Sequence, residues 1–408
     1  MPARDLTVGP ALQSLRASMG LKTRMYVSEW PGLHPASLLE RPKCANLPFP
    51  LSAPNGLYFF RARNAIYHLV RSLGLVQEGK ILVPDYHSGS EVWAIRAAGA
   101  AVCYYHIGRD LQPDLAQVRR LCESEKPRAL LTIHYNGWSQ PIEDLAELCA
   151  ERQITLIEDC AHAMLSANGD RPLGTYGHYS VFCLYKSLPV PNGGLLLCNG
   201  EVPEALTRLD LQPAGMLSVS GRTAELLLTW LRSRAFGVAT SMSALKRNAG
   251  RLLNAVHLTR LPIGEVGFDL RAVNAAISPL SLSLLETFDY QEIVRRRRHN
   301  FLYLRQRLAG RAELLRHDLP DGMCPLFFPL LVSDKPTAAA ALRMRGIAAV
   351  ETWNYGDGQA RGSQFADAQF LRDHVLELPI HPDLTTEQLE YMAGQVMNLN
   401  LPPTGFSH

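Results

Sequence analysis

The sequence lacks the features of several classes of protein. No window approaches the about 18 uninterrupted apolar residues of a membrane-spanning helix, and the first residues contain no apolar signal core. Basic and acidic side chains nearly balance, at 41 against 38, so no broad basic surface for nucleic acid is indicated. We therefore expect a cytoplasmic protein that binds neither nucleic acid nor a membrane.

Cysteine motifs are also missing. The eight cysteines are scattered, with no Cys-x-x-Cys pair, and the histidines do not cluster. Several of the cysteines lie in apolar segments, where a reduced thiol packs as a small hydrophobic side chain. We expect no metal site, and reduced thiols agree with a cytoplasmic location. One dense basic run, residues 295–298, is interpreted as a solvated helix face with one or two arginines at an interface.

The sequence does contain a regular alternation of helix and strand patterns. Apolar runs typical of strands follow amphipathic stretches typical of helices, and two more strand-like runs surround Lys186. Such alternation predicts crossover connections and an α/β fold whose mostly parallel sheet is covered by helices on both faces. The expected helices are residues 63–74, 90–99, 115–125 and 141–152, and the expected strands are 80–84, 101–106, 128–135, 154–159, 179–185 and 193–198.

The composition changes along the chain and predicts three parts. Residues 1–50 are rich in proline and are expected to form an extended arm, residues 51–255 a large domain, and residues 256–408 a smaller α+β domain that begins with long linking helices. Within 271–308 we expect a helix pair or one long helix, interrupted at Pro279 if at all. Strands are expected at 325–333, 347–351 and 375–379, and helices at 337–346 and 385–397, the last capped by Thr385 or Thr386.

Two residues suggest the chemistry. Asp159 follows an apolar strand, and ligands of open α/β sheets bind at the carboxyl ends of strands. Lys186 lies between apolar runs and before Gly193 and Gly194, where desolvation favours the free amine that imine formation requires. An aspartate that keeps a pyridine nitrogen protonated and a lysine that forms a Schiff base indicate pyridoxal phosphate. Taken singly, Asp159 could cap a turn and Lys186 could extend to solvent.

Four segments in this order resemble the DegT/StrS family of sugar aminotransferases, which are pyridoxal phosphate enzymes of fold type I. They are TIHYNGWSQPIEDL from residue 132, EDCAHA from 158, the lysine segment that ends in GGLLL, and LPIHPDLTTEQLEYM from 378. The resemblance implies a seven-stranded type of sheet in the large domain and a homodimer with the active site at its interface. It makes Lys186 the catalytic lysine, Asp159 the partner of the pyridine nitrogen and His162 a neighbour of the cofactor's phenolic oxygen. His134 is expected to lie behind the residues that contact the cofactor rather than to contact it directly.

The chain departs from this family at the cofactor's phosphate and ring. Arg61 and Arg63 stand where the family has Ser-Gly-Thr, so at least one of them is expected to bind an anion rather than form a structural ion pair. Cys183 replaces a phosphate-binding serine. Ser88 falls at the position of the stacking aromatic residue, which leaves Tyr86 or His87 for that role.

A further departure lies in the family's Gly-x-Asn-x-Arg segment, which reaches the neighbouring subunit. Here it reads 267–271 with Asp269 in place of asparagine, and Asp269 is expected to face elsewhere, or to contact Arg271 or a substrate amine.

The resemblance implies transfer of an amino group from glutamate or glutamine to a keto substrate, which could be a nucleotide-linked keto sugar or a natural-product intermediate. Decarboxylation, elimination or carbon–carbon bond formation would use the same Asp159 and Lys186 and stay open. A non-catalytic cofactor-binding sensor is a minor alternative. The dehydratase branch of the family has histidine in place of the lysine, so Lys186 argues against it.

Overall fold

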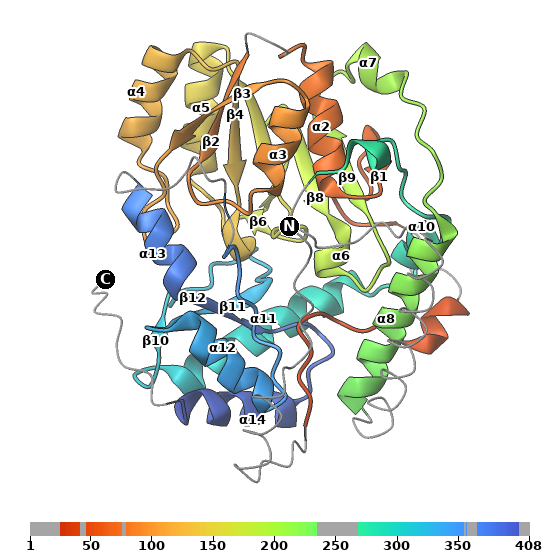
Figure 1. Ribbon diagram of the computed structural model, residues 1–408, viewed down its shortest axis with the longest axis vertical. Coiled ribbons are helices and arrows are strands. Elements are labelled where there is room, and N and C mark those ends of the chain that lie inside the picture. The colour runs from red at the N-terminus through yellow and green to blue at the C-terminus, as the bar shows by residue number, and fades with distance from the viewer. Residues whose placement is uncertain are drawn as a thin grey trace.

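The computed structural model describes residues 25–40, 46–75, 79–234, 268–354, 356 and 365–399. Figure 1 shows a large sheet with its helices in the upper half and a smaller sheet with its helices below. The elements are η1 Pro35–Leu38, β1 Gly56–Phe59, α2 Ala62–Ser72, β2 Lys80–Pro84, α3 Ser90–Ala97, β3 Ala101–Tyr105, α4 Leu115–Glu125, β4 Ala129–Ile133, η2 Tyr135–Gly137, α5 Ile142–Arg152, β5 Thr155–Asp159, β6 Ala167–Asn168, β7 Arg171–Pro172, β8 Tyr179–Cys183, α6 Leu184–Ser187, β9 Gly194–Cys198, α7 Glu204–Thr207, α8 Met216–Arg234, η3 Leu270–Ala272, α10 Pro279–Leu285, α11 Tyr290–Leu308, β10 Glu313–Leu314, β11 Phe327–Leu331, α12 Lys335–Met344, α13 Ala366–His374, β12 Val375–Pro379 and α14 Thr386–Met397.

The large sheet has seven strands in the order β1-β9-β8-β5-β4-β2-β3. The pairs β2–β3, β2–β4, β4–β5 and β5–β8 are parallel, and β9 runs antiparallel to both β8 and β1. The chain moves one way across the sheet from β2 to β3 and the other way from β3 to β4 and β5. Right-handed crossovers therefore place α3 on the opposite face from α4 and α5. The predicted α/β class and mostly parallel sheet are confirmed.

The sheet brings Asp159 and Lys186 to the same edge. Strand β5 ends at Asp159, which pairs with Val181 of the neighbouring parallel strand β8. Strand β8 ends at Cys183, two residues before the predicted end at 185, and the chain then forms one helical turn, α6, on which Lys186 lies. The carboxyl ends of both strands thus present the two side chains expected for the chemistry.

The Gly-Gly pair after Lys186 is explained by a close backbone approach. Strand β9 starts at Gly194 and passes the start of α2, so that a Cβ atom on Gly194 would lie 2.2 Å from the carbonyl carbon of Arg61. No side chain fits there, and Gly193 before it has a φ of +150°. Glycine at 194 therefore allows the start of α2 to lie beside the lysine segment.

The C-terminal unit is built on an antiparallel sheet in the order β10-β11-β12, with a core shared by α11, α12 and α14. Pro279 does not interrupt a helix but stands at the first turn of α10, where a proline loses no hydrogen bond. The break falls at residues 286–289, and Asp289 caps α11. Thr385 caps α14 in a capping box with Gln388, as predicted. Residues 347–351, predicted as a strand, form only single bridges, including one between Val350 and Glu377.

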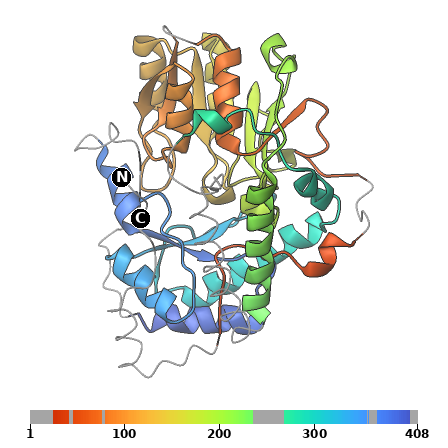
Figure 2. The same cartoon turned by 45° about the vertical axis from the view of Figure 1, so that its right-hand side comes forward.

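The described part of the N-terminal arm packs on both the C-terminal unit and α8. The amide of Val27 donates to the carbonyl of Gly346 at 2.9 Å, and the amide of Leu33 donates to that of Leu226 at 3.1 Å. Figure 2 shows α8 at the front of the molecule. The predicted boundary between residues 255 and 256 lies outside the described residues, so the three-part division stays a prediction. Within the described ranges, no helix has the length and apolar character to cross a membrane.

The basic run on α11 is less solvated than predicted. Arg297 is buried and donates to the carbonyls of Leu326 at 2.8 Å and Ser187 at 3.2 Å. Arg296 and Arg298 also donate to backbone carbonyls, whereas Arg295 pairs with Glu292 on the exposed side. Arg297 consequently ties α11 to the residue that follows Lys186.

Candidate active site

A cavity of about 480 Å³ opens at the carboxyl edge of the large sheet. Its wall combines residues of the large sheet unit, the arm, α8 and the C-terminal unit. Five of the predicted site residues line it together: Arg63, Asp159, His162, Cys183 and Lys186. Arg61, Tyr86 and His87 are not among the lining residues.

Asp159 is held in a desolvated position. Its Oδ1 accepts a hydrogen bond from the amide of Ala161 at 2.9 Å, and its side chain is almost fully buried. Burial, together with the carboxylate of Glu91, raises the pKa of Asp159 to about 7, although Lys186 opposes the shift. A cationic ring nitrogen beside this carboxylate would favour its ionised form.

The two other polar groups at this edge are electrostatic neighbours of Lys186. Burial, and then the charge of Lys186, holds the pKa of His162 well below its ordinary value, so His162 is a neutral imidazole at neutral pH. Burial raises the pKa of the Cys183 thiol, which remains protonated and is a weak donor. His162 can therefore exchange a hydrogen bond with a ligand oxygen without adding charge.

The two arginines of the divergent phosphate segment differ in position. Arg63, in the first turn of α2, lines the cavity and acts on the electrostatics of Cys183 and Tyr185. Arg61 is the residue before α2, and its guanidinium lies 5.4 Å from the centre of the Phe60 ring. Of these two arginines, Arg63 is the one that lines the cavity and is placed to meet an anion there.

The predicted aromatic residues turn away from the cavity. The His87 ring stacks on the Tyr104 ring with 5.7 Å between the ring centres. Tyr86 is buried against the rings of Tyr135 and Trp353. Instead, Trp353 lines the cavity and its ring lies 5.3 Å from that of His162. Trp353 has a φ of +52°, a conformation that is rare for a bulky side chain and often marks functional sites. The sequence pattern gave no sign of this residue, because it lies in a loop without periodicity.

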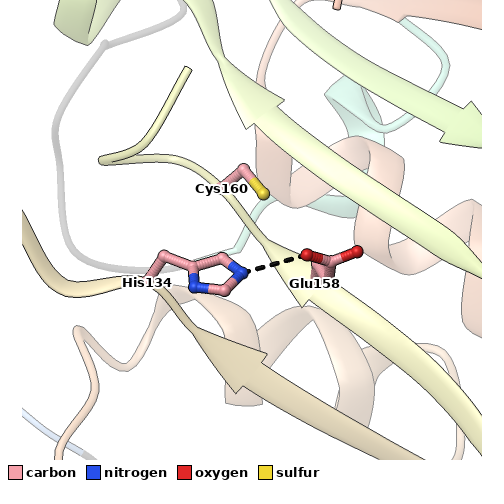
Figure 3. Close-up of side chains that lie close together, drawn as sticks. All are labelled: His134, Glu158 and Cys160. Carbon is pink, nitrogen blue, oxygen red and sulfur yellow. Dashed lines mark hydrogen bonds and ion pairs between the residues drawn. The ribbon is translucent and has the colours of Figure 1, made fainter. Parts of the chain in front are cut away.

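Behind Asp159, His134, Glu158 and Cys160 form a buried cluster (Figure 3). His134 Nε2 donates to Glu158 at 3.0 Å, while its Nδ1 accepts from the amide of Gln140. Burial alone would favour the protonated carboxyl, but hydrogen bonds from His134 and from backbone amides hold the pKa of Glu158 below its ordinary value. The Glu158 oxygens also accept hydrogen bonds from the backbone amides of residues 174, 176 and 177. The cluster thereby anchors β4, β5 and the loop before β8, with His134 outside the cavity lining.

A second charged group in the cavity wall comes from distant parts of the sequence. It consists of Glu29 from the arm, Arg222 from α8 and Glu351 from the C-terminal unit, with Trp30 beside them. Burial raises the pKa of Glu29, with Arg222 and Arg343 opposing the shift. Glu351 pairs with Arg343 at 2.9 Å. None of these residues was predicted, since each is an isolated charge in an unremarkable segment.

Asp269 contacts Arg271, which was one of the outcomes expected for the divergent segment at 267–271. Arg271 donates through Nε and Nη2 to the two oxygens of Asp269, each at 3.0 Å, on an exposed surface.

The seven-stranded α/β architecture, with a buried aspartate and a lysine at its carboxyl edge, is that of the fold-type I enzymes of pyridoxal phosphate. A model of the DegT/DnrJ/EryC1/StrS aminotransferase family matches residues 61–397, and the chain belongs to this family. The predicted resemblance is confirmed.

The chain is similar in sequence to curated relatives and similar in fold to a solved structure. The chain is 30% identical over 141 residues to a GDP-perosamine synthase of Vibrio cholerae, covering 34% of this chain and 38% of that one. It is 25% identical over 174 residues to a dTDP-4-dehydro-2,3,6-trideoxy-D-glucose 4-aminotransferase of Saccharopolyspora spinosa, covering 42% and 45%. The match thus spans less than half the length of these curated relatives. The structure of Helicobacter pylori PseC, an aminotransferase involved in the biosynthesis of pseudoaminic acid, superposes with a TM-score of 0.63 at 16% identity, covering 92% of this chain and 99% of that one.

Proposed function

We propose that the protein is a pyridoxal phosphate-dependent aminotransferase that moves an amino group from an amino acid, glutamate or glutamine, to a keto substrate. The observation that carries this proposal is the shared cavity of Asp159, His162 and Lys186 at the sheet edge. The keto sugars named for the relatives are the first acceptors to test, because the chain shares their family.

The residues present fit the cofactor. The buried Asp159 carboxylate, with its pKa raised to about 7, lacks a strong cationic partner, and a protonated pyridine nitrogen would supply one. At the other end, Arg63 and the start of α2 offer a guanidinium and backbone amides to a phosphate. Gly194, which has no side chain, allows the start of α2 to lie close to the lysine segment.

When bound, the cofactor supplies an electron sink for a carbanion at the carbon that carries the amino group. Lys186 would hold the cofactor covalently and would move a proton at that carbon through Nζ. Asp159 would keep the ring nitrogen protonated, and the neutral His162 would offer a hydrogen bond to the phenolic oxygen. Trp353 supplies the aromatic face that Ser88 lacks, while the arm, α8 and the C-terminal unit exclude water from the cavity.

We further propose a cytoplasmic homodimer. The exposed Asp269–Arg271 pair lies in the segment that the family uses at its subunit interface, and Arg271 is 89% exposed in the single chain. Light scattering coupled to size-exclusion chromatography tests this part, and a monomer at micromolar concentration would contradict it.

Borohydride reduction followed by peptide mapping tests the cofactor assignment. The purified protein with pyridoxal phosphate should carry the reduced cofactor on Lys186. Label on another lysine would exclude the proposed catalytic residue.

Amino transfer is tested by adding L-glutamate or L-glutamine to the loaded protein and following the visible absorbance band. Loss of this band with formation of pyridoxamine phosphate supports the proposal. If the loaded protein never yields pyridoxamine phosphate with a panel of amino acids, aminotransfer is wrong and decarboxylation, elimination or carbon–carbon bond formation takes its place.

A further inference from the structure

Arg222 presents an unused hydrogen-bond donor in the cavity wall. It extends from α8 into the same cavity as Lys186. Its Nη1 donates to Glu225 one turn further along the helix at 3.1 Å, whereas its Nε is buried and has no hydrogen-bond partner among the described residues. Leaving a buried guanidinium donor without an acceptor is unfavourable, so the position suits a ligand that brings one.

The acidic residues near Arg222 leave its charge largely available. Glu225 is about half exposed, at 51%, so its ion pair with Arg222 is screened by solvent. Glu351 is already paired with Arg343 at 2.9 Å. Burial favours the protonated form of Glu29, which forms no ion pair within 4.0 Å in the described part of the chain.

Helix α8 holds Arg222 at a fixed place. The carbonyl of Leu226 accepts the amide of Leu33, and the rings of Trp230 and His34 meet edge to face at 4.7 Å. At the end of the helix, Gln388 of α14 donates to the carbonyl of Ser233 at 3.4 Å. A guanidinium on an anchored helix loses little freedom when it binds a ligand.

Among the residues that the structure describes, three cationic side chains line the cavity, and their roles are separable. Lys186 is the reactive amine, and Arg63 lies with Cys183 and Tyr185 at the start of α2. Arg222 remains, with Glu29 as its electrostatic neighbour. Two adjacent N–H groups of a guanidinium match the two oxygens of a carboxylate, and every amino acid donor carries a carboxylate.

We infer that Arg222 binds a carboxylate of the amino donor. This inference rests on the proposed aminotransferase function and adds to it the residue that selects the donor. The neutral end of a keto sugar ring offers no such anion, so Arg222 acts in the donor half of the reaction.

The test follows the visible absorbance band of the loaded enzyme while L-glutamate or L-alanine is added. In Arg222→Gln, the L-glutamate concentration that gives half of the maximal rate should rise about 10- to 100-fold, the loss expected for a charged hydrogen bond. The maximal rate should change much less, and Arg222→Lys should recover part of the affinity. A normal absorbance band and circular dichroism spectrum establish that the variants fold and bind cofactor.

Glu225→Gln is the matched control, because it breaks the same ion pair and keeps the guanidinium. It should leave the half-saturating L-glutamate concentration unchanged. A loss in Arg222→Gln with both donors assigns the α-carboxylate, and a loss with L-glutamate alone assigns the side-chain carboxylate.

Two results would overturn the inference while pyridoxamine phosphate still forms. The half-saturating L-glutamate concentration could stay unchanged in Arg222→Gln, or it could rise equally in Glu225→Gln. A wild-type enzyme that converts no donor would instead refute the proposed function.

Discussion

The cavity has two charged regions that were assembled differently. The first, the Lys186 group, consists of Arg63, Asp159, His162, Cys183 and Lys186, all from elements of the large sheet unit. The second, the Arg222 group, consists of Glu29, Arg222 and Glu351, which come from the arm, α8 and the C-terminal unit. The first group is fixed by paired strands, whereas contacts between distant segments fix the second.

In the proposed reaction, this difference separates the chemistry from the selection of the substrate. Proton transfer needs atoms held at fixed positions, and neighbouring parallel strands hold them there. Selection of a substrate depends on side chains that can change without altering the sheet. Variants of the Lys186 group should therefore fail with every donor and acceptor, while variants of the Arg222 group should change which donors are used.

The largest effect is expected for Lys186→Ala. Loss of the amine should slow conversion of every amino donor by about 10⁴-fold, because both the covalent link and the proton transfer depend on it. Single-turnover kinetics measure this rate. Lys335→Ala is the control: Lys335 is also buried, and burial lowers its pKa to about 8, but Lys335 itself does not line the cavity and donates to the carbonyls of Thr352 and Arg372. It should lower the denaturation midpoint and keep the rate, and an inactive Lys335→Ala with a normal fold would blur the distinction between the two lysines.

The next largest effect concerns the pH dependence of Asp159. Its pKa is about 7 in the folded protein without cofactor and 3.8 ordinarily, so between these values the folded state binds the extra proton. The contribution of Asp159 to the free energy of unfolding therefore falls as the pH rises through this window. The asparagine of Asp159→Asn cannot ionise. The free energy of unfolding of this variant, relative to that of the wild type, should therefore increase by at most about 4 kcal/mol as the pH rises through this window. Chemical denaturation of the cofactor-free proteins measures the difference, and a pH-independent difference would contradict it.

Arg297 tests whether the Lys186 group depends on support from α11. Arg297→Met leaves the carbonyls of Ser187 and Leu326 without their donor and should destabilise the protein by about 2–4 kcal/mol, as measured by urea denaturation. Arg297→Met should also weaken binding of the cofactor, and should therefore lower the activity by the same factor with every amino donor. Arg295→Ala, on the exposed side of the same helix, should leave the denaturation midpoint unchanged. Equal effects of the two substitutions would show that the contact with Ser187 is unimportant.

Trp353 is expected to give the smallest effect. An aromatic face contributes about 0.5–1.5 kcal/mol, so Trp353→Ala should raise the dissociation constant of pyridoxal phosphate by about 2- to 10-fold. Trp353→Phe should retain most of the affinity. Fluorescence titration of the cofactor-free protein measures the constant. Tyr86→Leu, which removes the ring, serves as the control, because Tyr86 does not line the cavity. A larger effect of this variant than of Trp353→Ala would assign the stacking role to Tyr86.

The helices and strands of the large sheet were largely predictable. The patterns at 115–125 and 80–84 match α4 and β2 to the residue, because strong periodicity and apolar runs specify buried faces. Errors occurred where local signals were ambiguous. A helix pair was one of the two predictions for 271–308 and is present, but Pro279, the expected place of any interruption, starts α10. Residues 347–351 resembled a strand but form only isolated bridges. Strand β1 and helix α13 went unpredicted.

The amino-acid pattern was enough to predict the family, the sheet and a shared edge for Asp159 and Lys186. Asp159 ends strand β5, and Lys186 lies on the helical turn that follows strand β8. These two strands are close in the sequence and adjacent in the sheet, so the strand patterns place both residues at one edge. The folded chain was needed to see that Trp353, and not Tyr86 or His87, lines the cavity, and that Arg222 lies there with Glu29 and Glu351. The physical reason is that these side chains lie on an arm, a helix and a loop that no common hydrogen-bond ladder connects. Their positions follow from how separate segments pack against one another, which periodicity along the chain does not encode.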